Sequence, residues 1–101
     1  MKPQDKYCAI PYYRRNQYDL LRRISMDKDT FSISYDEMQA ITEARYHEME
    51  KSGFQVCKID IDAQELSAWC NRQGVGINSE SRTRFVMIEL KKLIDHWVFL
   101  P

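Results

Sequence analysis

The stretch FQVCKIDIDAQEL, residues 54–66, predicts a β-strand that runs directly into a helix. Apolar and polar residues alternate over its first half, which is the period of two of a half-buried strand. Asp62 and Glu65 then have the spacing of a capping box, and Ile61 and Leu66 take the flanking positions of a hydrophobic staple. We therefore expect the strand to end at Ile61, with Asp62 capping the helix that follows.

A second capping box, SYDE at residues 34–37, predicts a helix upstream of this strand. It should run to Lys51 or Ser52, because Gly53 then supplies the left-handed residue that often ends a helix. Downstream, the helix capped by Asp62 should stop at Gly74 for the same reason.

Both ends of the chain also carry regular patterns. Residues 7–13 alternate as a strand does, and Pro11 confines that strand to an edge or an end of a sheet. Asn16 is then the expected cap of a helix running to about Ser25. Asn78 or Ser79 should cap the last helix, which is expected to run from Ser79 to about Trp97.

These elements predict one α+β domain spanning residues 1–101, in the order strand, helix, helix, strand, helix, helix. We expect the strands at 7–13 and 54–61 to pair and the helices to pack on one face. Whether residues 31–33 add a third strand stays open. A two-stranded sheet is marginal alone, so either that strand joins or two protomers combine their sheets or terminal helices. We therefore predict a homodimer.

Composition limits the classes of function. The chain is 44% hydrophobic and 30% charged with only 3 Gly and 3 Pro, which excludes a disordered chain. Fifteen basic residues balance fifteen acidic ones, which argues against a dedicated binder of nucleic acid. The balance is uneven along the chain, since residues 1–30 carry +3 and residues 31–62 carry −4. These segments should complement each other within the fold or be solvated.

The cysteines and the chain start bear on location. Cys8, Cys57 and Cys70 are odd in number and lack metal-ligand spacing, so they predict neither a disulfide framework nor a zinc site. No segment has the pattern of a secretion signal or a membrane span. We expect a cytoplasmic protein that meets no membrane.

The last helix has apolar residues on two sides. One stripe, centred on Leu90, has the spacing of a core face. Other apolar residues point away from it, so this helix needs a second surface to cover it. The leading hypothesis is thus a non-enzymatic protein-interaction module that acts as a homodimer. Its predicted contact surface consists of Phe85, Ile88, Glu89, Lys92 and Phe99.

A nucleic-acid accessory protein is the first alternative. Its candidate contacts are Arg14, Arg15, Arg22 and Arg23, which are interleaved with tyrosines. The more ordinary interpretation is that these arginines pair with the acidic surplus of residues 31–62. A helix-turn-helix over residues 64–84 fits poorly, although Arg82 and Arg84 are placed to touch phosphate.

A small enzyme or ligand binder is the second alternative. It would need an aromatic pocket, for which the candidates are Tyr12, Trp69, Cys70 and Trp97. No nucleotide-binding or hydrolase motif occurs, so the sequence implies no catalytic residue and no cofactor. Glu43, His47 and Glu50 share one helix face, but ion pairs explain them better than a metal.

Several short motifs together carry a resemblance. They are the IPYY run at residues 10–13, the capping box at 34–37, and ELSAWC at 65–70 with Gly74, Asn78 and Arg82. Over residues 10–84 the chain resembles short, uncharacterised bacterial proteins of the integron or mobile gene cassette type. Gln64 departs from the acidic residue expected there, which leaves the helix cap intact. The resemblance implies a small cytoplasmic α+β protein with no assigned activity.

Overall fold

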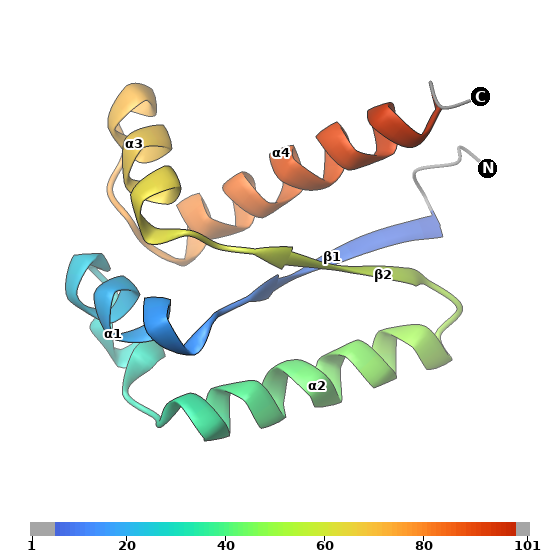
Figure 1. The fold of residues 1–101 in the computed structure, drawn as a ribbon, viewed down its shortest axis with the longest axis horizontal. Helices are drawn as coiled ribbons and strands as arrows, with labels where there is room; N and C mark the ends of the chain where they lie inside the picture. The colour runs from blue at the N-terminus through green and yellow to red at the C-terminus, as the bar shows by residue number, and fades with distance from the viewer. Residues whose placement is uncertain (1–5, 99–101) are drawn as a thin grey trace.

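The computed structural model describes residues 6–98, and of residues 97 and 98 the backbone only. Two strands and four α-helices, with one short 3-10 helix, make up this part of the chain (Figure 1). In chain order they are β1 (Tyr7–Tyr12), α1 (Arg15–Ile24), η2 (Lys28–Phe31), α2 (Tyr35–Lys51), β2 (Gln55–Asp60), α3 (Ala63–Gln73) and α4 (Ser79–Val98). The predicted α+β fold is confirmed.

The two strands pair as predicted, and they run parallel. Tyr7 aligns with Gln55 and Tyr12 with Asp60. The crossover between them contains α1, η2 and α2, as a parallel connection requires. Both α2 and α4 contact both strands.

The prediction that the helices pack on one face is wrong. The sheet lies between α2 and α4, which cover opposite faces (Figure 1). A parallel sheet buries both faces, because its crossover helix covers one and a later helix covers the other. Three layers result, with the strands in the middle.

Most helix ends lie where the sequence predicts them. Ser34 Oγ accepts a hydrogen bond from Glu37 N at 3.1 Å at the start of α2, and the following Gly53 has a φ of 93°. Asp62 Oδ1 caps α3 by accepting from two backbone N–H groups. Gly74 ends that helix with a left-handed φ of 68°.

The predicted Asn16 cap is wrong, because the N-cap of α1 is Arg14, two residues earlier. The side chain of Arg14 makes no cap hydrogen bond and reaches instead to acids near the end of β2. Residues 31–33 form no strand. Phe31 ends η2 and is fully buried in the core.

The core joins all layers through a cluster of aromatic and aliphatic side chains. Phe31 packs edge-on against Tyr13 and Tyr18, with ring centroids 5.5 and 5.6 Å apart. Ile61 and Leu66, the predicted staple, are also fully buried. Within residues 6–98, no helix is long and apolar enough to cross a membrane.

Candidate interaction surface along the open edge of β1

One edge of β1 pairs with β2, and among the described residues no strand pairs with the other edge, which we call the open edge. Tyr12 O accepts a hydrogen bond from Ile61 N at 3.1 Å, so the backbone polar groups of Tyr12 point toward β2. Because these directions alternate along a strand, those of Ala9 and Pro11 point the opposite way. Pro11 has no N–H, which suits this open edge and would break the ladder on the other. Position 11 thus fits the prediction that Pro11 marks an edge.

A groove of about 510 Å³ runs along this open edge. Its lining includes β1 residues, residues of both flanking helices and none of β2, so it lies on the side of β1 away from β2. The lining residues are Ala9, Ile10, Pro11, Tyr13, Thr30, Ile33, Met38, Ile41, Thr42, Arg45, Met49, Ser79, Arg82, Thr83, Val86 and Met87. They include no carboxylate, imidazole or thiol.

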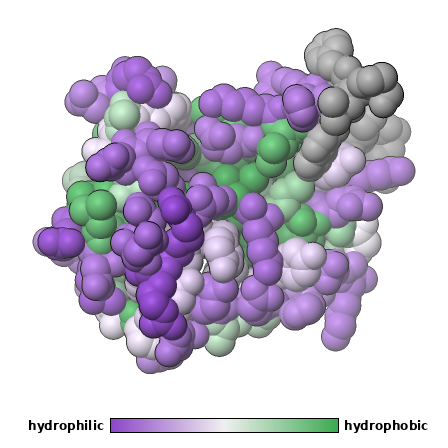
Figure 2. Space-filling view, in the orientation of Figure 1, coloured by the Kyte–Doolittle hydropathy of each residue, from purple (hydrophilic) through white to green (hydrophobic). Residues whose placement is uncertain are grey.

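The walls of the groove expose apolar side chains on both helices. Ile41 of α2 is 46% exposed and Met87 of α4 is 52% exposed. We call these two residues the groove rims. Large apolar side chains left open on both sides of a groove are typical of a surface that a partner covers. The face that Figure 2 shows is mostly hydrophilic, with hydrophobic patches between α4 and the strands and at the α1 end.

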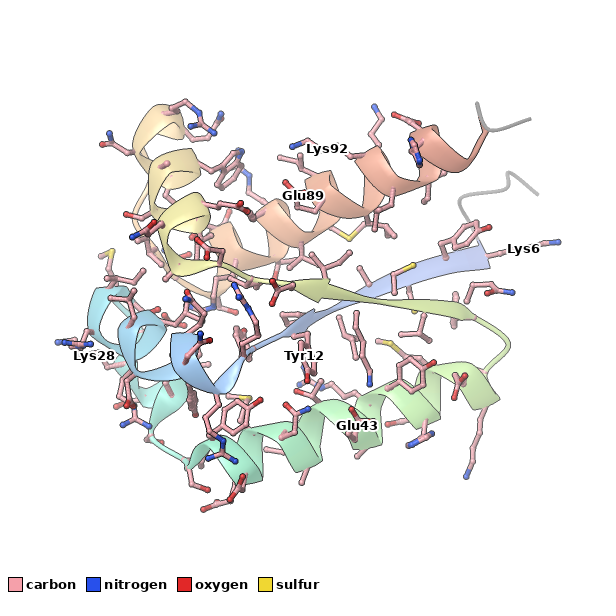
Figure 3. All side chains as sticks on the ribbon, in the orientation of Figure 1. Lys6, Tyr12, Lys28, Glu43, Glu89 and Lys92 are labelled. Carbon is pink, nitrogen blue, oxygen red and sulfur yellow. The ribbon has the colours of Figure 1, made fainter. Side chains whose placement is uncertain are left out.

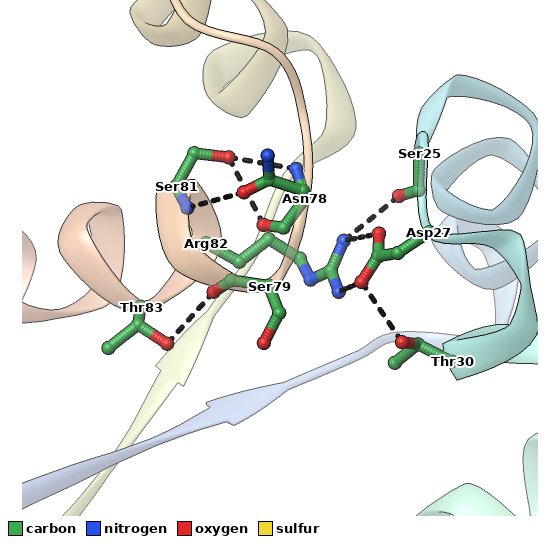
Figure 4. Close-up of polar contacts among 8 residues, drawn as sticks. All are labelled: Ser25, Asp27, Thr30, Asn78, Ser79, Ser81, Arg82 and Thr83. Atoms are coloured by element: carbon green, nitrogen blue, oxygen red, sulfur yellow. Dashed lines mark hydrogen bonds and ion pairs between the residues drawn. The ribbon is translucent and has the colours of Figure 1, made fainter.

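The groove lining includes Arg82, a buried arginine that forms an ion pair with the half-buried Asp27 (Figure 4). Arg82 is 4% exposed, and its two terminal nitrogens bond both carboxylate oxygens of Asp27 at 2.9 and 2.5 Å. Ser25 accepts a further bond from Arg82, and Thr30 donates one to Asp27. The guanidinium also stacks over the Phe31 ring at 4.8 Å. This cluster fixes the start of α4 against the loop after α1.

The ion pair changes the titration of Asp27. The hydrogen bond from Arg82 holds the pKa of the Asp27 carboxyl below its ordinary value. No pattern in the sequence predicts this cluster, since Asp27 stands in a charged run typical of a solvated loop. Arg82, which the sequence places within reach of phosphate in a helix-turn-helix, instead lies inside the protein.

The predicted contact surface on α4 is only partly on the outside. Phe85 is 4% exposed and packs edge-on against Trp69 at 5.9 Å, so its predicted outward position is wrong. α3 crosses that side of α4 and buries it, which the sequence of one helix does not reveal. Ile88 is 38% exposed, and Lys92 bonds Glu89 at 3.1 Å on the helix surface (Figure 3). Phe99 lies outside the described residues.

Two of the four arginines predicted to contact a partner instead form ion pairs with acidic residues of the segment 31–62. Arg14 bonds Asp60 at 3.0 Å and Asp62 at 3.3 Å. Arg15 bonds Asp36 at 2.6 Å. The acidic surplus of residues 31–62 therefore complements this basic segment, as the more ordinary interpretation predicts.

The other two arginines differ from each other. Arg22 donates to the backbone oxygens of Phe31 and Ile33 and stacks over the Tyr18 ring at 5.2 Å. Arg23 is exposed. Because Arg22 is held by the fold, the cluster does not form a continuous free basic surface.

Of the residues predicted to share a pocket, the three with described side chains do not come together. Tyr12 lies on the α2 side of the sheet, where Lys58 Nζ is 5.7 Å from its ring (Figure 3). Trp69 lines a separate shallow hollow between α3 and α4. Cys70 is 1% exposed in the core, and the side chain of Trp97 lies outside the described residues.

The acidic residues considered for a metal site make ion pairs instead. Glu43 Oε1 lies 2.7 Å from Lys58 Nζ, and this bond raises the pKa of the Lys58 ammonium. His47 Nδ1 lies 3.5 Å from Glu50. Within residues 6–98, no group of three or more metal-binding side chains is placed to hold an ion.

Two of the free cysteines have thiols that favour the protonated form. Burial raises the pKa of Cys8, and burial together with the nearby Cys8 raises the pKa of Cys57. We expect both thiols to react with a disulfide reagent at neutral pH more slowly than a free cysteine, because less thiolate is present. The measurement is the rate of colour release in the folded chain, compared with the same chain in guanidinium chloride. A fast phase in the folded chain would contradict it.

The comparisons with known proteins leave the likeness to gene-cassette proteins as a prediction. No protein-family model matches the chain, and no curated protein or solved structure matches it.

Proposed function

We propose that this chain is a non-enzymatic protein-interaction module that acts as a homodimer through the groove along β1. The observation that carries the proposal is the open groove between two helices, each with a half-exposed apolar rim. Burying apolar surface is the main favourable term in most protein association. The contact surface is thus proposed on the groove side of α4 rather than on the outer side favoured by the sequence.

The chemistry of the groove supports association over catalysis. Its described lining offers hydroxyl groups and two arginines but no acid, imidazole or thiol to move a proton. One of those arginines, Arg82, is already bonded to Asp27. An apolar protein surface suits such a lining better than a reacting substrate does.

The free cysteines bear on the location of the protein, and the arginine contacts bear on the alternative of a nucleic-acid partner. Three free cysteines suit a reducing compartment, so we propose the cytoplasm. A nucleic-acid partner is less well supported, because Arg14, Arg15 and Arg22 are engaged within the fold.

Sedimentation equilibrium tests the proposal with two pairs of substitutions. We expect the wild-type chain to show twice the mass of one chain. Ile41→Glu with Met87→Glu should weaken association at least about 100-fold, because two unpaired carboxylates would be buried at the contact. The matched control is Ile88→Glu with Leu93→Glu, which places the same charges at two α4 residues that do not line the groove.

Each outcome has a distinct meaning. A dimer that is lost only with the rim substitutions supports the groove. A dimer lost only with the control pair moves the contact to the outer side of α4 and refutes the groove. A wild-type chain that stays monomeric at every concentration refutes the homodimer.

A further inference from the structure

We infer that two copies of this chain join the open edges of their β1 strands in antiparallel fashion, about a twofold axis at Ala9. The product is one continuous sheet of four strands in the order β2, β1, β1, β2. This inference rests on the proposed function and specifies how the groove is filled.

The backbone at the open edge supports this centre of pairing. The N–H and C=O of Ala9 point away from β2, because those of Tyr12 point toward it. In an antiparallel pair centred there, Ala9 N–H donates to the carbonyl oxygen of the partner's Ala9, and the Ala9 carbonyl oxygen accepts the reciprocal bond from the partner's N–H. Pro11 offers a carbonyl but no donor at the same edge, so it limits how far the ladder extends.

The two rims favour a second copy over an added peptide strand. Ile41 and Met87 belong to helices on opposite faces of the sheet (Figure 1). Packed layers lie roughly 10 Å apart, so the two rims, which flank the sheet, are separated by roughly 20 Å. One added peptide strand would fill a width of only ~5 Å in the middle layer and would leave both rims uncovered. A second copy related by this axis brings its own α2 beside α2 and its own α4 beside α4, and can cover both rims. The second copy also extends the sheet from two strands, which are marginally stable alone, to four strands.

The level of Ala9 along α2 predicts which charges meet. Cys8 Sγ lies 3.5 Å from Met49 Sδ, so residue 8 of β1 is level with residue 49 of α2. One residue of a strand advances ~3.3 Å, about as far as two residues of a helix. Because α2 runs opposite to β1, moving from Cys8 to Ala9 along β1 corresponds to moving back about two residues along α2. Ala9 is therefore level with about residue 47. The twofold axis then sets Arg45 opposite Glu48 of the partner subunit. Both side chains are exposed, and neither has an ion-pair partner among the described residues.

The charge of the whole chain permits such an approach. The formal net charge is zero, so two copies meet without net repulsion. The two symmetric contacts between Arg45 and Glu48 then favour the antiparallel arrangement of the α2 helices over a parallel one.

The first test changes the backbone at the open edge alone. Ala9→Pro removes the donor at the axis and leaves the β2 side of β1 intact, as Pro11 already does two residues away. We expect the dissociation constant from sedimentation velocity to rise about tenfold or more, while circular dichroism stays that of the wild type. Ala9→Ser keeps the donor and should dimerise like the wild type.

The second test reverses charges on α2. Arg45→Glu and Glu48→Arg should each raise the dissociation constant, because each creates two like-charge contacts across the axis. The double reversal restores both pairs and should return it to within about threefold of the wild type.

The outcomes separate this inference from the function on which it rests. A monomeric wild-type chain refutes the homodimer and everything built on it. A stable dimer that tolerates Ala9→Pro overturns the pairing through β1 and leaves the groove homodimer standing. Should Ala9→Pro fail to fold, a double reversal no better than either single change overturns the pairing instead.

Discussion

Replacing Arg82 by Met will lower the free energy of unfolding by about 1.5–3 kcal/mol, because the half-buried Asp27 carboxylate, 27% exposed, loses its charged hydrogen-bond donor. Met fills much of the space of the arginine side chain but leaves Asp27 without its two strongest hydrogen bonds. Ser25, which is 2% exposed, loses a donor as well. Urea unfolding followed by circular dichroism measures the change.

An exposed ion pair gives the matched control. Arg15 and Asp36 lie 2.6 Å apart with side chains 71% and 80% exposed. Arg15→Met should therefore change the free energy of unfolding by less than about 1 kcal/mol. Equal stabilities for the two variants would show that the bond between Arg82 and Asp27 contributes no more than a surface contact.

The pH dependence of stability gives the same pair a second signature. Because the folded state lowers the pKa of Asp27, the unfolded state binds its proton more readily in acid. The stabilisation is fully present above the ordinary aspartate pKa of about 3.9 and is lost as the pH falls through the lower folded value. In Arg82→Met this part of the acid destabilisation should disappear, so the two stability curves converge toward low pH.

Replacing Phe31 by Ala should cost about 3–5 kcal/mol, the range for deleting a buried aromatic side chain. Phe31 is fully buried and makes edge-on contacts with Tyr13 and Tyr18, which the smaller side chain cannot keep. Since domains of this size are stable by only about 5–15 kcal/mol, the variant should melt at a much lower temperature. Differential scanning calorimetry measures the shift.

Two further variants serve as controls for the effect of Phe31→Ala on the melting temperature. Met26→Ala removes a large apolar side chain that is 73% exposed and should leave the melting temperature nearly unchanged. The double variant of Phe31 and Arg82 should cost less than the sum of the singles, because the guanidinium stacks on the ring. Strict additivity would mean that the stacking carries no energy.

The ends of helices could be predicted from the sequence because their signals are local. Ser34, Gly53, Asp62 and Gly74 each act within about four residues of their own position, and the structure places all four at helix ends. The two strands themselves were predictable in the same way from their period of two.

The layers and the site depend on contacts between distant residues, which no local pattern reports. Phe85 and Ile88 both lie off the Leu90 stripe, yet α3 covers Phe85 and leaves Ile88 open. The partner of Arg82 is 55 positions away in a segment that looks solvated. The groove is likewise made by four elements, β1, η2, α2 and α4, that meet only once the chain has folded.

The parallel pairing of β1 and β2 has a consequence for the nascent chain. Residues 13–54 separate the two strands, and a ribosome adds ~5–20 residues per second. For several seconds of synthesis β1 therefore exists without β2, while α1 and α2 form their own local hydrogen bonds. A polypeptide released before residue 55 would carry helices without a sheet and would present both edges of β1 to any other chain emerging nearby.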